Sequence, residues 1–259
     1  MNENKSVGIV NGGIYDGPEY ATSTRFLGSR VPAVGTKVEF DDGRKFVMCS
    51  TEVDIPAGSV VATPTCLATV IANLCAAASI GATQIVITSA GLSFFGGAAG
   101  VIAQNKLAGG YITFTDDLGE GYQYRIKSNT AATAATTLTI TLFDPLKIAI
   151  DATSDVFIVA PRYESVVIGT ATLAPVGVVV IPATAATNAR KEYIWVQTAG
   201  IACVRIETGT NVAIGKTLAA DANGGLKLAG AVTDVMLGVA MATSTTATAK
   251  IPVLLNIGG

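Results

Sequence analysis

Three stretches of alternating polar and apolar residues follow one another within residues 111–143, and they constrain the fold more than any other feature of the chain. Residues 122–127 place two tyrosines and an isoleucine on one side of an extended backbone, with Gln, Arg and Lys on the other. Residues 111–115 and 138–142 alternate in the same way and carry β-branched and aromatic residues that suit a pleated sheet. Turn-forming residues separate the three stretches, so the sequence predicts a three-stranded meander.

Shorter signals of the same kind precede this meander. Asp41-Asp42-Gly43 lies between two apolar runs and predicts a tight hairpin turn. Residues 83–88 predict a strand with two isoleucines on one face. Residues 66–82 form an apolar run of nearly membrane-spanning length, but the run contains polar residues and lacks charged or aromatic flanks. We expect a buried segment there, with one short helix over residues 67–77.

Residues 161–259 repeat the strand pattern, with alternating segments at 194–197 and 204–207. In the next segment, four large apolar residues are predicted on one face and three small residues on the other: Val235, Leu237, Val239 and Met241, opposite Gly238, Ala240 and Ala242. Residues 250–257 predict a final strand that contains Pro252. Because proline lacks a backbone donor, this strand is predicted at the edge of a sheet.

These signals predict an all-β fold of short-stranded β-sandwich or β-barrel domains, with an extended N-terminal arm and little helix. We expect the arm at residues 1–35, a β domain at 36–160 and a small β-barrel or sandwich domain at 161–259. In an alternative division, residues 66–155 form a subdomain inserted into a barrel made by the flanking segments.

The composition predicts a protein that works by packing against other surfaces. Hydrophobic residues make up 50% of the chain and charged residues 14%, whereas about 25% charge is usual in soluble domains. The net charge is −2 and no lysine or arginine run is present, so nucleic acid is not expected as a partner. The first residues lack the apolar segment of a secretory signal, which predicts a protein made and kept in the cytoplasm or in something assembled there.

No motif predicts catalysis, a cofactor or a metal. The chain has no histidine, which excludes a histidine-dependent triad, and its four cysteines lack CxxC spacing and are expected as small buried thiols. Residues 209–217 resemble a phosphate-binding loop but have five residues between the glycines instead of four, so we expect a β-turn with an exposed lysine. Asp116, Asp117 and Glu120 offer oxygen ligands for a hard cation, but acidic residues in a turn more often face water.

Four aromatic residues are the candidate contacts to other subunits or to a larger assembly. Tyr15, Tyr20 and Phe26 lie in the predicted arm, which we expect to become ordered on a neighbouring molecule, with plain disorder as the alternative. Trp195 is interpreted as a core residue or a subunit-contact anchor, in preference to a sugar-binding platform.

Three parts of the chain resemble bacteriophage capsid decoration (cement) proteins. They are residues 35–46 with 57–61, residues 119–129 with 144–146, and the glycine-punctuated end formed by 215–216, 237–240 and 253–255. The resemblance implies a β-rich virion protein without catalytic residues, often a homotrimer, that sits on the capsid outer surface and contacts the major capsid protein and other copies of itself. It also implies assembly in the host cytoplasm, with neither nucleic acid nor membrane as a partner.

Two other functions stay open at this point. A tail or fibre protein that binds a receptor shares the β-rich composition, but long repeats or a fibrous period would be expected and neither is present. A polysaccharide-degrading enzyme needs a cleft lined with aromatic and acidic residues, and 6% aromatic content argues against one.

Overall fold

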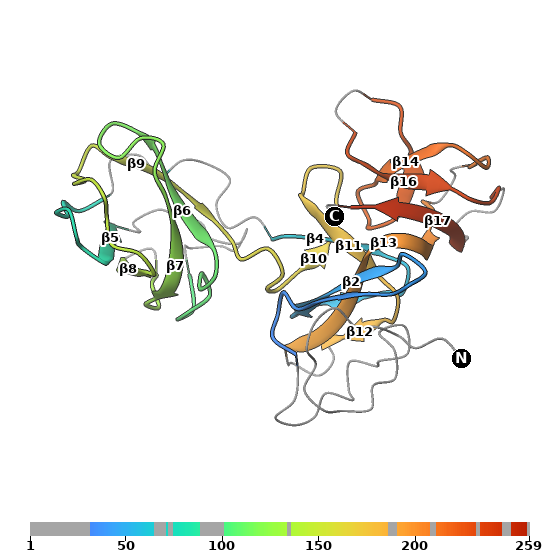
Figure 1. Ribbon diagram of the computed structural model, residues 1–259, viewed down its shortest axis with the longest axis horizontal. Coiled ribbons are helices and arrows are strands. Elements are labelled where there is room, and N and C mark those ends of the chain that lie inside the picture. Colours follow the sequence, from blue (N-terminus) through green and yellow to red (C-terminus); the bar gives the residue numbers. More distant parts are fainter. Residues whose placement is uncertain are drawn as a thin grey trace. The chain divides into compact units, whose positions relative to one another are not determined.

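The computed structural model describes residues 32–64, 71, 75–88, 101–133, 136–185, 191–207, 211–231, 234–244 and 250–257. The chain divides into two compact units: unit one comprises Met1–Thr63 and Tyr163–Gly259, and unit two comprises Pro64–Arg162. Each unit has its own sheets and its own core (Figure 1). Every named element among the described residues is a β-strand, which confirms the predicted all-β class.

Unit two is built on a five-stranded antiparallel sheet. Its strands are β5 (Gln84–Thr88), β6 (Tyr111–Asp116), β7 (Gln123–Asn129), β8 (Thr137–Leu142) and β9 (Asp155–Val159), in the spatial order β5-β8-β7-β6-β9. Strands β6, β7 and β8 are neighbours in chain order, so the predicted meander is confirmed. The alternating residues of each strand face one core, where the rings of Phe114 and Tyr124 meet edge to face at 6.2 Å. Tyr122 lies just before β7 and stacks on Tyr124 while staying half exposed.

The helix predicted over residues 67–77 is wrong at the described positions. Ile71 and Cys75 instead form antiparallel bridges with Val156 and Ile87, and Ala76 donates its backbone N–H to Val86. Periodicity alone does not separate a short buried helix from a buried extended segment, and here backbone pairing to β5 and β9 decides for the extended form. Within the described part of the chain, no helix has the length and apolar character needed to cross a bilayer.

Unit one contains a ten-stranded sheet and a two-stranded one. The strands are β1 (Lys37–Glu39), β2 (Lys45–Thr51), β3 (Asp54–Ile55), β4 (Val60–Ala62), β10 (Val167–Ile168), β11 (Pro175–Val179), β12 (Ala183–Thr184), β13 (Glu192–Arg205), β14 (Thr217–Ala220), β15 (Leu226–Leu228), β16 (Met236–Ala240) and β17 (Lys250–Asn256). The large sheet runs β10-β4-β11-β13-β17-β16-β14-β15, with β1 and β2 joined to it through β13. The predicted hairpin is present, because β1 pairs with β2 around Gly43, whose φ is +83°.

Strand β13 joins the two parts of this large sheet. The predicted segment 194–197 and the first two residues of the segment 204–207 lie in one continuous strand, which pairs with β2 as far as Ala199 and with β17 from Ala199 to Arg205. A register shift between Gln197 and Ala199 and a φ of +81° at Gly200 mark the bend where the partner changes. Beyond the bend the sheet curls, since a parallel bridge from Ile206 to Leu226 brings β15 back beside the end of β13. The curled strands enclose a core of aliphatic residues.

Two predictions for the C-terminal strands are wrong. Leu237 is an extra residue in β16, because Leu218 of β14 pairs with Gly238 whereas the next residue of β14 pairs with Met236. This bulge puts Leu237 and Ala240 in the core and leaves Val239 outside, so the four large residues do not share a face. Strand β17 is not at an edge but lies between β13 and β16.

The position of Pro252 explains how β17 tolerates a proline inside the sheet. The carbonyl of Pro252 accepts a hydrogen bond from Met241 N at 3.0 Å, so the proline nitrogen faces the same neighbour, β16. The β16 strand ends at Ala240, one residue before Met241. The missing donor therefore falls where the ladder stops.

The domain boundary expected at residues 160–161 is replaced by a different division. Residues from both sides of it build unit one, because β2 pairs along its length with β13. The alternative of a subdomain inserted at 66–155 lies close to the observed unit two, Pro64–Arg162. Of the predicted arm, residues 1–31 lie outside the described residues.

Candidate interaction surface

The outer face of the curled sheet carries six uncharged side chains in two rows across β13, β17 and β16. The first row is Ile201, Leu254 and Val239, which are register partners across the three strands. The second row lies two residues along each strand and consists of Cys203, Pro252 and Met241. Register partners project from the same face of a sheet, so these six residues form one continuous surface, named here the outer stripe.

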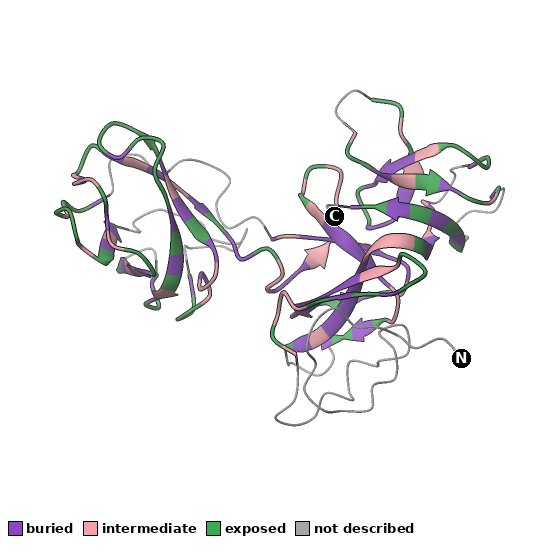
Figure 2. Ribbon diagram, in the orientation of Figure 1, coloured by how far each residue is buried: buried purple, intermediate pink, exposed green. Residues whose placement is uncertain are grey.

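The outer stripe is open to solvent. The exposed fractions are 53% for Ile201, 48% for Leu254, 39% for Val239 and 42% for Met241, and Cys203 is also exposed. Exposed residues alternate with buried ones along β17, as the green and purple segments of Figure 2 show. The alternate residues of the same strands, including Ala202, Val253 and Leu255, are buried in the core. An antiparallel sheet with one covered face usually has polar residues on the other, so an apolar outer face indicates a binding surface.

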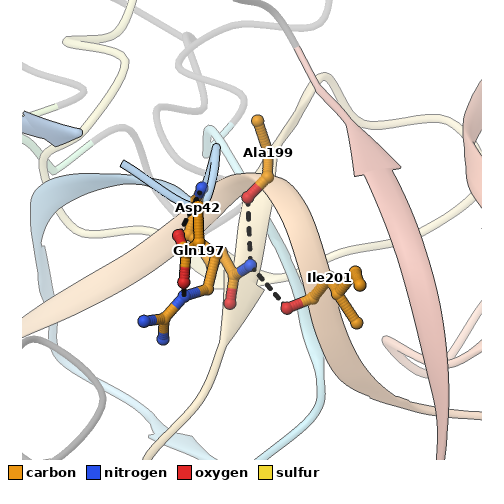
Figure 3. A network of polar contacts seen from close by, with 5 residues as sticks. Asp42, Gln197, Ala199 and Ile201 are labelled. Carbon is orange, nitrogen blue, oxygen red and sulfur yellow. Dashed lines mark hydrogen bonds and ion pairs between the residues drawn. The ribbon is translucent and has the colours of Figure 1, made fainter. Parts of the chain in front are cut away.

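A buried amide fixes the end of the outer stripe nearest the bend in β13. Gln197 is almost fully buried, and its Nε2 donates to the carbonyls of Ala199 and Ile201, both at 3.0 Å (Figure 3). A Cβ on the intervening Gly200 would lie 2.8 Å from Arg44 Cα, so the hairpin between β1 and β2 packs directly against the bend. These contacts hold Ile201 in place on the outer face.

The two ends of the outer stripe differ in charge. At one end Arg205 and Lys250 are register partners, so two cations lie side by side on this face. No carboxylate among the described residues lies within ion-pair distance of either one. At the other end Ala199 pairs with Asn256, which offers an amide. The stripe is thus neutral in the middle, cationic at one end and polar without charge at the other.

The acidic turn and the segment that resembles a phosphate-binding loop form no site among the described residues. Asp116 is the exposed last residue of β6, and its Oδ1 accepts the backbone N–H of Asp117 at 2.9 Å. Asp117 and Glu120 follow in the turn and are also exposed. Nowhere in the described ranges do three or more acidic or cysteine side chains come together to hold a metal ion. In the segment that resembles a phosphate-binding loop, Gly215 (φ +81°) and Lys216 lead into strand β14 instead of a helix.

A polar cluster around Ser50 was not predicted from the sequence, because its members are far apart in the chain. Ser50 Oγ donates to Glu164 Oε2 at 2.7 Å and accepts from Ser165 N at 3.0 Å, and Lys191 forms an ion pair with Glu164. Ser50 is fully buried, so its hydroxyl is inaccessible to a substrate. The cluster fastens the segment after unit two to strand β2.

The cysteines differ in accessibility. Cys49 and Cys75 are buried, as predicted, but Cys203 is exposed on the outer stripe, and Cys66 lies outside the described residues. Burial, together with the negative charge of Asp155, raises the pKa of Cys75 to about 11. Cys75 is therefore held as an inert thiol.

Of the four predicted contact residues, Trp195 is the one among the described residues, and it is not part of the outer stripe. Trp195 is buried in a cluster with Phe46 and Met48, which fits the core alternative of its interpretation. Tyr15, Tyr20 and Phe26 lie outside the described residues. The residues of the outer stripe were not predicted as contacts, because their exposure depends on the bulge in β16 and on the central position of β17.

The fold and this surface define an all-β protein with an exposed apolar face on one of its sheets. Comparison of the chain with protein families, with characterised proteins and with solved structures finds no match.

Proposed function

We propose that the chain is a non-enzymatic structural protein of a phage virion, which binds the outer surface of the assembled capsid and stabilises it as a decoration protein. The outer stripe is the observation that carries this proposal. Its six side chains offer uncharged area on a rigid sheet, and each contact that covers it removes apolar surface from water at about 25 cal/mol per Å². The resemblance to cement proteins is the reason for proposing a phage capsid as the assembly to which the chain binds.

The composition supports the same role. A chain with 14% charged residues and a net charge of −2 has little electrostatic repulsion to overcome when many copies crowd on one lattice. The proposed partners are the major capsid protein and other copies of this chain, and the proposed location is the outer surface of the virion. A protein that binds the assembled lattice but not its separate parts stabilises the shell by mass action.

The test is a decoration experiment. Purified protein is added to undecorated, expanded heads of the phage that encodes it, and bound protein and the melting temperature of the heads are measured. We expect saturable binding and a higher melting temperature. Binding to host cells or glycans without binding to heads would instead support the receptor-binding tail or fibre function.

A further inference from the structure

We infer that the outer stripe packs face to face against the outer stripe of a second copy of this chain, about a two-fold axis that lies between the two sheets, parallel to their planes and perpendicular to the strands. This pairing deepens the proposed function and rests on its claim that the chain associates with copies of itself. It assigns the outer stripe to the contact between copies, so the capsid contact of the proposed function lies on another face of the pair. It replaces the trimer implied by the resemblance with a two-fold pair. In such a two-fold contact the pairs are reciprocal: if one residue of the first copy touches a second residue of the other copy, the same two residues touch again with the copies exchanged.

The sizes of the side chains in the two rows suit this axis. An axis above the row of Ala202 and Val253, midway between the two rows of the stripe, places the first row of one copy over the second row of the other. The branched side chains of Ile201, Leu254 and Val239 then meet the row of Cys203, Pro252 and Met241. The cysteine and proline side chains of this second row are smaller and project less far from the sheet. Side chains of unequal size across an interface interdigitate better than two identical rows.

The charges at the ends of the stripe select the direction of the axis. An axis parallel to the strands would bring Arg205 and Lys250 of one copy against the same two cations of the other. The perpendicular axis places them instead against the row of Ala199 and Asn256, where the Asn256 amide oxygen accepts hydrogen bonds. Like charges side by side are unfavourable, so the perpendicular axis is the one that the sequence permits.

The first experiment tests whether the outer stripe is the contact. The mass of the full chain in solution is measured by sedimentation equilibrium over a range of concentrations, and the wild type is expected to approach twice 26.3 kDa. Leu254→Lys puts a charge in the centre of the contact and should weaken pairing by roughly 100-fold or more. Ile80→Lys changes a more exposed apolar residue, which lies in unit two, and should leave pairing unchanged. Circular dichroism confirms that both variants are folded.

The second experiment tests the direction of the axis at one position. Asn256→Asp places a carboxylate against Arg205 and Lys250 of the other copy, so it should tighten pairing several-fold, and Asn256→Lys should weaken it. Both effects should shrink at high salt. An axis parallel to the strands predicts that Asn256→Asp weakens pairing, since it would bring two carboxylates together.

A monomeric wild type, a trimer, pairing that survives Leu254→Lys, or weaker pairing with Asn256→Asp would each overturn the inference. Its failure is distinguishable from failure of the proposed function. A monomer that still decorates heads removes the pairing alone, and a pair that binds no heads removes the decoration function alone.

Discussion

Gln197 ties together the backbone of β13 at its bend. Its buried amide occupies two backbone carbonyls at the bend, and removing it leaves both acceptors without that donor. We expect Gln197→Met to lower the free energy of unfolding of unit one by about 1–3 kcal/mol, measured by urea denaturation. The same substitution at exposed Gln123 should change stability by less than about 0.5 kcal/mol. An unchanged Gln197→Met protein would show that the bend is set by the backbone alone.

Asp234 gives the protein a pH-dependent contact. Its carboxylate accepts backbone N–H groups from Gly230 and Ala231 and pairs with Lys227 at 2.9 Å. The N–H donors, Gly230 first, and the lysine hold the pKa of Asp234 well below its usual range. The contact therefore stabilises the folded state above the usual aspartate pKa of about 3.9 and loses this effect as pH falls below it.

The corresponding prediction concerns Asp234→Asn. At neutral pH the variant should be less stable than the wild type, and the difference should shrink as pH is lowered below the usual aspartate pKa. Urea unfolding at pH 7 and at pH 3 measures it, with Asp144→Asn as an exposed control. A difference that is equal at both pH values would exclude the charge of Asp234 as its cause.

At the scale of elements, the close approach of β16 and β17 depends on a glycine. A Cβ on Gly238 would lie 2.3 Å from the carbonyl oxygen of Leu254, and a backbone atom cannot move aside cheaply. We expect Gly238→Ala to destabilise unit one by about 1–3 kcal/mol in urea denaturation. Gly230→Ala adds a Cβ where no atom lies within 4 Å and should have little effect. Equal stability of the two variants would mean that β16 and β17 separate freely.

For some elements, the alternation of neighbouring residues is sufficient to predict the strand and its buried face. The strands of unit two follow directly from alternation, because each buries one face in one core. In β16 one extra residue reverses the faces, and no sequence signal marks Leu237 as a bulge. The prediction that β17 lies at an edge was wrong. Proline is excluded from an inner strand where its neighbour needs a backbone N–H, but the nitrogen of Pro252 lies opposite Met241, beyond the end of β16.

At the scale of the whole molecule, unit two is an insertion between two paired positions of unit one. Ala62 at the end of β4 is the register partner of Val167 in β10, so the chain leaves and re-enters unit one close to one place. We expect a chain in which Pro64–Arg162 is replaced by a short Gly/Ser linker to unfold cooperatively, and the excised Pro64–Arg162 segment to do so as well. Thermal unfolding followed by circular dichroism tests both. Loss of cooperativity in either piece would show that its core needs the other unit.

The sequence by itself determined the strand class, the meander, the first hairpin and the low charge, because these depend on the alternation and chemistry of neighbouring residues. Only the tertiary structure decided how β13 is shared between β2 and β17, which residues of β16 face outward, and hence that six apolar side chains lie together in the open. Pairing between distant strands sets those features, and a bulge or a change of partner alters which face a side chain occupies without changing its local pattern.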